Sequence, residues 1–302
     1  MSTFKKRETV VQNIAYMGLM AAINVVFVLL TTFVPVLFFL IVFVLPLTST
    51  VVALHCKKRY YPIYAVATIG ICMLCTMWKI DDTIFYIIPS IITGFIFALM
   101  VEKEISAPWI IITTTIIQLI FSCLAIPLII VLFGRDIVIT FASIFGLQSY
   151  QYIDYIAPAS IFFLSLIQCS LSFIVTNEEI KKFGYELKEA KLNSYYLLIA
   201  LWSSMVVTMV FALTYKPLSY TSMLISLYFV CVLIAGLLQR KKKWIYIVLP
   251  ISFFLSFFLF AIFYPYAEEP LGLLLLNIFF FVVSIIVLID NSLLNKQNKD
   301  TI

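Results

Sequence analysis

Residues able to support catalysis or to bind a metal are few in this chain. His55 is the single histidine, so neither a zinc site nor a nucleophile–histidine pair would find a second imidazole. Cys72 and Cys75 are spaced as one thiol pair, but a lone pair inside an apolar stretch is typical of helix packing. Asp81 and Asp82 could bind a metal together with a phosphorylated lipid, yet no second Asp-rich motif accompanies them. We therefore expect no enzyme, no catalytic residue, no metal site and no cofactor.

The binding of a small amphipathic solute is a second kind of chemistry that the sequence indicates. Polar and aromatic residues gather in two predicted outer loops, and the candidate ligand-binding residues are Trp78, Asp81, Asp82, Arg135, Tyr152 and Asp154. Such groups can hold a ligand between helices, although Trp and Tyr also form ordinary belts at membrane interfaces. The apolar segment 134–154 is long for a loop. It is interpreted either as a lid over this pocket, or as a helix in the membrane interface or an extension of the flanking spans.

Uncharged polar residues interrupt several of the apolar stretches. They are Asn24, Gln118, Ser122, Gln168 and Asn277. Polar groups are costly in lipid and usually face the interior of a helix bundle, so we expect the amides to form hydrogen bonds between helices. None of these residues is charged, which disfavours an ion-driven transporter. Asp154 and Asp290 are expected at the ends of spans, where solvent is available.

Membrane-spanning helices are the elements that must position these residues. Of 302 residues, 64% are hydrophobic and 12% charged, whereas soluble domains have about half and about a quarter. About 20 apolar residues cross a bilayer as a helix, and windows of this length predict ten spans, with eight as the alternative count. The spans are 10–33, 35–54, 61–78, 83–101, 108–133, 154–176, 194–214, 219–238, 245–264 and 270–289. The predicted fold class is all-α, a polytopic transmembrane helix bundle.

Basic residues predict how this bundle is oriented. With the N-terminus in the cytoplasm and ten spans, the inner segments hold all but three of the 20 Lys and Arg residues, the exceptions being Lys79, Arg135 and Lys216. Cytoplasmic loops are enriched in positive charge, so we expect a multi-pass protein of the cell membrane with both termini cytoplasmic and an uncleaved first span. The net charge of +5 then reflects contact with the anionic lipid bilayer, and no nucleic acid is expected as a partner.

The longest polar segment, 177–191, divides the chain into two groups of spans. Asn177 is a predicted N-cap, and the segment is expected to form a short amphipathic helix on the inner membrane surface. The predicted domains are a six-helix membrane core at 1–176, a cytoplasmic amphipathic connector at 177–192 and a C-terminal four-helix membrane region at 193–302.

The first predicted span has two unlike faces. On a helical wheel with about 100° per residue, Ala15, Gly18 and Ala22 form a flat face. The bulky opposite side carries Asn13 and Asn24. Small residues allow the backbone of a second helix to approach closely, so the flat face is predicted to bind a partner. A later span of the same chain is the alternative occupant.

Several segments, taken in order, carry a resemblance to a known family. After the small-residue first span come FVLPLTSTVVALHCKKRYYPIYAV (43–66), IIPSIITGFIFALMVEKE (87–104) and YIAPASIFFLSLIQCSLSFIVTNEEIKKFGYELKE (155–189). In this order they resemble the YybS-like family of uncharacterised bacterial membrane proteins over most of the chain. That family is distantly similar to the S components of energy-coupling-factor transporters.

The resemblance implies an S-component-like core that binds a vitamin or similar micronutrient at its outer face. It also implies that a small-xxx-small face of the first helix contacts a transmembrane coupling subunit, and Gly18 and Ala22 match that spacing with Gly in place of the first Ala. We expect a protein that binds or helps to transport a small solute with separate ATPases, since the chain has no nucleotide motif. Its four additional helices depart from S components. The alternative is a non-enzymatic scaffold of cell-envelope assembly or division, because the MreD-like family is also similar in fold.

Overall fold

The chain is helical throughout the part that the computed structural model describes, namely residues 6–34, 38–77, 80–134, 138–139, 153–182, 193–263, 265 and 275–300. Its α-helices are α1 (Val10–Phe33), α2 (Phe38–His55), α3 (Tyr61–Cys75), α4 (Ile80–Glu102), α5 (Ala107–Phe133), α7 (Ile153–Lys182), α8 (Ser194–Thr214), α9 (Lys216–Gln239), α10 (Lys243–Phe263) and α12 (Asn277–Asp300), and the short 3-10 helix η2 (Lys58–Tyr60) precedes α3. No strand occurs in these ranges, which confirms the all-α prediction.

The lengths and apolar compositions of the described helices fit a lipid bilayer. Those long and apolar enough to cross it are seven, namely α1, α4, α5, α7, α8, α9 and α10. The apolar stretches Val44–His55 in α2 and Asn277–Leu293 in α12 are shorter, and α3 has 15 residues. The predicted class, a polytopic transmembrane bundle, is therefore confirmed. The counts of ten or eight spans stay predictions.

Local signals explain several helix ends. The hydroxyl of Thr9 accepts a hydrogen bond from the Gln12 amide at 3.2 Å, and the Gln12 side chain returns a contact to the Thr9 N–H, so a capping box starts α1. Helices α3, α5 and α9 carry Pro in the first turn, where a missing N–H costs no helical hydrogen bond. Gly134 ends α5 with φ of 64°, a left-handed conformation that favours glycine.

The polar segment 177–191 begins differently from its prediction. Asn177 lies inside α7, which continues without a break to Lys182, so the predicted N-cap at Asn177 is wrong. Lys181 pairs with Glu178 and Lys182 with Glu179, both three residues apart, and pairs at this spacing favour continued helix. Residues 183–192, the rest of the predicted connector, lie outside the described residues.

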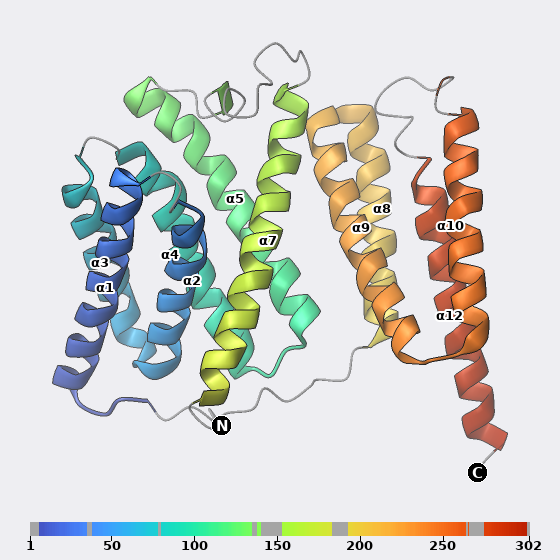
Figure 1. Cartoon of the computed structure of the whole chain (residues 1–302), viewed down its shortest axis with the longest axis horizontal. Helices are drawn as coiled ribbons and strands as arrows, with labels where there is room; N and C mark the ends of the chain where they lie inside the picture. Colours follow the sequence, from blue (N-terminus) through green and yellow to red (C-terminus); the bar gives the residue numbers. More distant parts are fainter. Residues whose placement is uncertain are drawn as a thin grey trace. The chain divides into compact units, whose positions relative to one another are not determined.

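The chain divides into two compact units. Unit 1 comprises Met1–Ile153 with Ser160–Lys191, and unit 2 comprises Asp154–Ala159 with Leu192–Ile302. Figure 1 traces the helices in chain order, from α1 in blue to α12 in red. The three-part domain division drawn from the sequence stays a prediction.

Unit 1 is held together by one close helix crossing and by an apolar core. Helix α2 packs against α1 and α4, and α4 packs in turn against α5. At the α2–α4 crossing, a Cβ added at Gly94 would lie 2.7 Å from the Pro46 carbonyl oxygen and 2.5 Å from Ser49 Cβ. Thr50 Oγ1 donates to the Pro46 carbonyl at 2.7 Å and lies 3.2 Å from the Gly94 carbonyl. Only glycine permits this approach of the two backbones.

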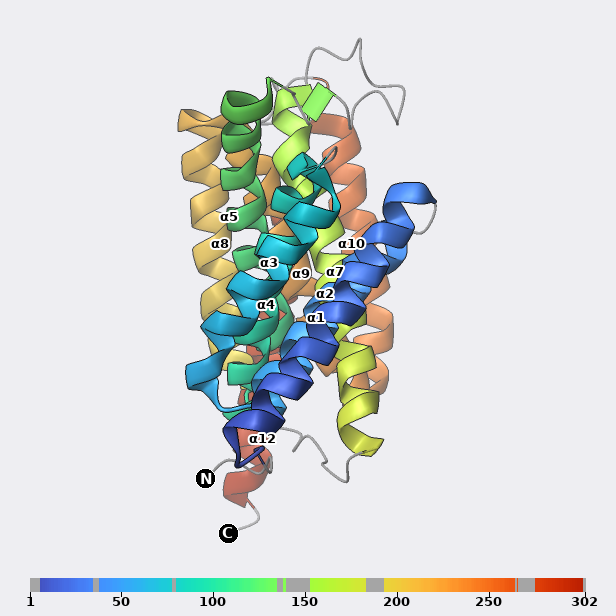
Figure 2. The same ribbon diagram turned by 90° about the vertical axis from the view of Figure 1, so that its left-hand side faces the viewer.

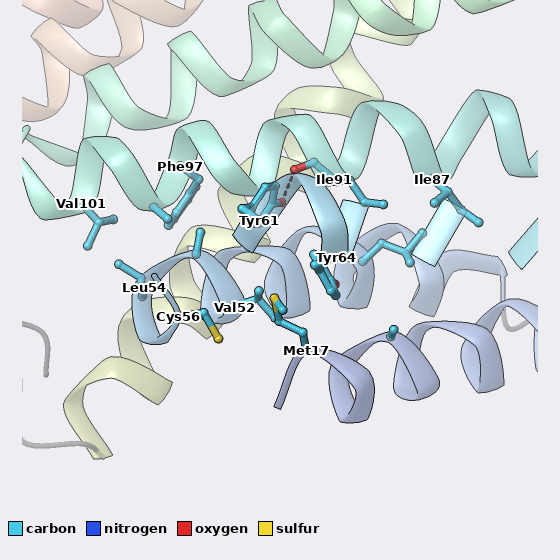
Figure 3. Packing of buried hydrophobic residues seen from close by; sticks show 14 of the residues in the cluster. Met17, Val52, Leu54, Cys56, Tyr61, Tyr64, Ile87, Ile91, Phe97 and Val101 are labelled. Atoms are coloured by element: carbon cyan, nitrogen blue, oxygen red, sulfur yellow. Dashed lines mark hydrogen bonds between the residues drawn. The ribbon is translucent and has the colours of Figure 1, made fainter. Parts of the chain in front are cut away.

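The core of unit 1 gathers large side chains around α3. Figure 3 shows Tyr61 and Tyr64 of α3 among buried residues of the neighbouring helices. Tyr61 Oη donates to the Ile91 carbonyl of α4 at 2.6 Å, which ties α3 to α4 within the apolar surroundings. A buried tyrosine usually finds such a partner, because an unpaired hydroxyl is costly to bury.

Unit 2 is built on the hairpin of α8 and α9. Ser226 Oγ of α9 donates to Ser204 Oγ of α8 at 2.9 Å within this pair. Helix α12 packs against both α9 and α10. Many large apolar side chains of α10 are exposed, among them Phe254 and Phe258, as is expected of a helix that faces lipid.

Candidate functional site

The predicted partner-binding residues lie together on an open side of α1. Ala15, Gly18 and Ala22 are all exposed, and a Cβ added at Gly18 would meet no atom within 4 Å. Helix α1 lies at the surface of unit 1 (Figure 2). The flat face is therefore uncovered within the described part of unit 1, and the alternative that a later span of the chain occupies it stays a prediction.

The opposite side of α1 faces its own unit, as the helical wheel predicted. Asn13, Met17, Ala21, Asn24 and Val28 are all buried, at intervals of three and four residues. This spacing forms a single helical stripe. The small residues point outward because the bulky and polar ones are held inward.

Asn24 is held at mid-helix by two hydrogen bonds. Its Nδ2 donates to Tyr64 Oη of α3 at 2.8 Å, and its Oδ1 accepts from Thr48 Oγ1 of α2 at 2.6 Å. All three side chains are buried. The amide therefore joins three helices, and the expected role of Asn24 in hydrogen bonding between helices is confirmed.

Asn13 holds the beginning of α1 in a similar way. Its Nδ2 donates to the carbonyls of Arg7 and Thr9 at 3.0 and 2.6 Å, and its Oδ1 accepts from the Lys57 backbone N–H at 2.9 Å. The Arg7 backbone N–H in turn donates to the His55 carbonyl at 3.0 Å. These bonds join the segment before α1 to the turn between α2 and α3.

Charged groups reinforce this end of unit 1. Glu102, at the end of α4, pairs with Lys6 at 2.8 Å and with Lys58 at 2.5 Å, and its side chain is 7% exposed. The guanidinium of Arg7 lies 3.4 Å from the centre of the Tyr16 ring, a cation–π contact. The N-terminal segment, η2 and the end of α4 thus meet at one end of the unit.

A second polar cluster joins α4, α5 and α7. Thr93 Oγ1 donates to Gln118 Oε1 at 2.7 Å, and Gln168 Nε2 donates to Ser90 Oγ at 3.3 Å. These four side chains are buried, as is Ser122. The expected hydrogen bonding between helices is therefore confirmed for Gln118 and Gln168.

Asn277 behaves differently from the other amides. It is buried near the beginning of α12, and neither atom of its amide has a hydrogen-bond partner among the described residues. Its burial was predicted, but the expected hydrogen bond between helices does not form there.

Most of the side chains predicted to form the outer pocket are not among those that the structure describes. Asp81 is half-buried in the first turn of α4. Asp82 and Asp154 lie in the first turns of α4 and α7, and their side chains are not described. Outside the described residues lie Trp78, Arg135 and Tyr152, together with most of the segment 134–154. The ligand pocket stays a prediction.

Asp290 lies in an environment that differs from its prediction. It was expected at a solvated span end, but its side chain is 0% exposed in unit 2. It forms ion pairs with Arg240 and, at 2.7 Å, with Lys242. The sequence contained a signal for this burial: Asp290 is a lone carboxylate at the end of an apolar stretch, and the run 240–243 is cationic. A buried charge needs a partner of opposite sign.

Together the long apolar helices and the buried, mutually bonded polar side chains define the class of protein: an integral membrane protein with several spans. Comparison of the chain with protein-family models, curated proteins and solved structures finds no match.

Proposed function

We propose that this protein is an S-component-like membrane subunit that docks on a transmembrane coupling partner through the outer side of α1 and carries a small solute in unit 1. The observation that supports the proposal is the rotation of α1. Asn13 and Asn24 are turned inward, and Ala15, Gly18 and Ala22 are left on the open side.

The open side of α1 suits a helix better than it suits lipid. Lipid chains adapt to bulky and flat helices alike, whereas a partner helix gains dispersion contacts when small residues let the two backbones approach. A Cβ at Gly18 would meet nothing within 4 Å, so a partner would have free access to the backbone there. The partner would supply the ATPase function through a separate module.

The solute would be held either by uncharged polar side chains in the interior of unit 1 or by the polar and aromatic residues of the predicted outer rim. In the described interior of unit 1, the polar groups of mid-helix are hydroxyls and amides such as Tyr64, Gln118 and Gln168. Mass spectrometry of small molecules that remain after gentle purification tests this part of the proposal. Asp82→Ala or Arg135→Ala should reduce the retained amount if the predicted rim binds the solute.

The docking face is tested by substitutions that fill it. Gly18→Leu or Ala22→Leu should weaken association with the partner by about tenfold, or about 1.4 kcal/mol, because a larger side chain holds the backbones apart. Pull-down from membranes in mild detergent measures the association, with Ala67→Leu at an exposed position of α3 as the matched control.

The proteins recovered distinguish the two functions. A coupling subunit with ATPases supports the transport role, whereas recovery of envelope-assembly proteins alone supports the scaffold alternative. Equal recovery with Gly18→Leu, Ala22→Leu and wild type would show that the flat face of α1 does not bind the partner.

A further inference from the structure

We propose that unit 2 contains a binding site for a phosphate-type oxyanion, formed by Arg240, Lys242, Asn291 and the beginning of α8. The site is independent of the function proposed for unit 1. Its evidence is an excess of positive charge and of hydrogen-bond donors at one end of α8, α9 and α12.

The charges of the cluster do not cancel. Asp290 is the only carboxylate that the described structure places in contact with the two cations, Arg240 and Lys242. One negative charge against two positive charges leaves a net charge of about +1. The cationic side chains are 26% and 25% exposed, so an anion can reach them from outside the helix bundle.

The hydrogen-bond donors also outnumber the acceptors. Both oxygens of Asp290 are engaged, one by Arg240 and the other by Lys242. The Asn291 Oδ1 accepts from Arg240 Nη1 at 3.1 Å, but the Asn291 Nδ2 has no hydrogen-bond partner among the described residues, although the residue is only 8% exposed. Since a guanidinium offers five N–H groups and an ammonium three, this cluster has donors left over for an acceptor-rich ligand.

The beginning of α8 adds to the same potential. Arg240 Nη2 donates to Ser194 Oγ at 3.2 Å, which places the guanidinium beside the first residue of this 21-residue helix. The Asn193 Oδ1 accepts from the Tyr195 N–H at 3.0 Å, and the other N–H groups at this helix N-terminus carry partial positive charge that favours anions. The arrangement therefore combines a guanidinium, an ammonium, a buried free amide donor and a helix start.

Phosphate is the oxyanion that this set of donors suits best. Arginine binds phosphate oxygens through two parallel N–H groups, and lysine adds a point charge. The site lies where membrane-length helices begin and end, which is the depth of lipid headgroups. The ligand is therefore either the phosphate of an anionic lipid or a free phosphate, and both share this chemistry.

Asp290 keeps the site in place when no anion is bound. A fully buried carboxylate would be costly alone, and its pairing with Arg240 and Lys242 orders both cations. This also guides the choice of variants. Lys242→Gln removes the excess charge but leaves Asp290 paired with Arg240, so the fold of unit 2 is preserved.

The experiment measures binding by the full chain in an uncharged detergent. The thermal unfolding midpoint is measured at increasing concentrations of inorganic phosphate, with chloride keeping the ionic strength constant. Native mass spectrometry counts the bound phosphatidylglycerol and phosphatidylcholine molecules. We expect Lys242→Gln and Asn291→Leu to weaken oxyanion binding by about tenfold each, since each removes a direct donor. Lys242→Arg should retain it.

The control is Lys241→Gln, which removes an exposed cation one residue away from the site. It should bind as the wild type does, which separates this site from the general basic character of the turn. If free phosphate does not displace bound phosphatidylglycerol, the site binds lipid. If free phosphate displaces it, the site accepts the phosphate of a lipid and free phosphate alike. Equal losses in Lys241→Gln and Lys242→Gln, or no preference over chloride and phosphatidylcholine, would overturn the proposal.

Discussion

At the scale of single residues, two asparagines determine which side of α1 is open. Asn13 and Asn24 are about three helical turns apart on the same side of α1, and each amide uses both its nitrogen and its oxygen in hydrogen bonds to neighbouring segments. Rotation of α1 would unpair both, and an unpaired amide is costly in an apolar environment. The exposure of Ala15, Gly18 and Ala22 is therefore a consequence of polar groups on the other side of the helix.

The first residue-scale prediction concerns the bond between Asn24 and Tyr64. Asn24→Leu should lower the free energy of unfolding by about 1–2 kcal/mol, because Tyr64 Oη loses its donor at 2.8 Å. Unfolding of the full chain by titration with SDS in mixed micelles measures the change. Tyr64→Phe and the double variant complete a double-mutant cycle. Additive effects would show that the two side chains stabilise the unit separately.

At the scale of elements, the packing of unit 1 depends on the crossing of α2 and α4. Pro46 and Gly94 meet there, and Thr50 bonds to the Pro46 carbonyl within α2. Proline lacks an N–H and glycine lacks a side chain, so these residues normally weaken a helix. Here they allow close contact between two helices, and the lost helical stability is offset by packing.

The element-scale prediction is that Gly94→Ala destabilises unit 1. The added Cβ would lie 2.7 Å from a backbone oxygen, which cannot move without shifting α2. We expect a loss of about 1–3 kcal/mol in the free energy of unfolding, as is typical of overpacking. Gly70→Ala in α3 is the matched control, because its Cβ would meet nothing within 4 Å. Equal effects of the two substitutions, measured by the same SDS titration, would contradict this account of the crossing.

At the scale of the whole molecule, each unit gathers basic residues at a helix-bundle end. In unit 1, Lys6, Lys58 and Glu102 bring the N-terminal segment, η2 and the end of α4 together. In unit 2, Arg240 and Lys242 join the α9–α10 turn to α12. Within each unit, these contacts therefore join segments that the distribution of Lys and Arg predicts to be cytoplasmic.

The molecular prediction follows from this charge distribution. Cysteines added at either terminus of a variant without native cysteines should react with an impermeant maleimide only after the inner face of the membrane is opened, because basic segments remain in the cytoplasm. Labelling in intact cells provides the measurement, and a cysteine introduced at Lys216 is the outward-facing control. A carboxyl terminus labelled from outside, with the amino terminus still protected, would require an odd number of spans.

Composition and periodicity were sufficient for the class of protein and for the faces of α1. The length of an apolar stretch predicts a spanning helix, because lipid surrounds the helix along the whole span and disfavours polar residues throughout it. Small-residue spacing predicts the flat face because neighbours on one helix are set by its pitch alone. The inward positions of Asn24, Gln118 and Gln168 follow from the cost of placing an amide in lipid.

The tertiary structure alone decided which residues meet. Asn24 with Tyr64, Pro46 with Gly94, and Arg240 with Asp290 are pairs about 40 to 50 residues apart. Their contacts depend on which helices are neighbours, and helical periodicity carries no information on that choice. Asp290 was misplaced for this reason: a carboxylate at a span end is solvated or buried according to whether a cation on another helix faces it.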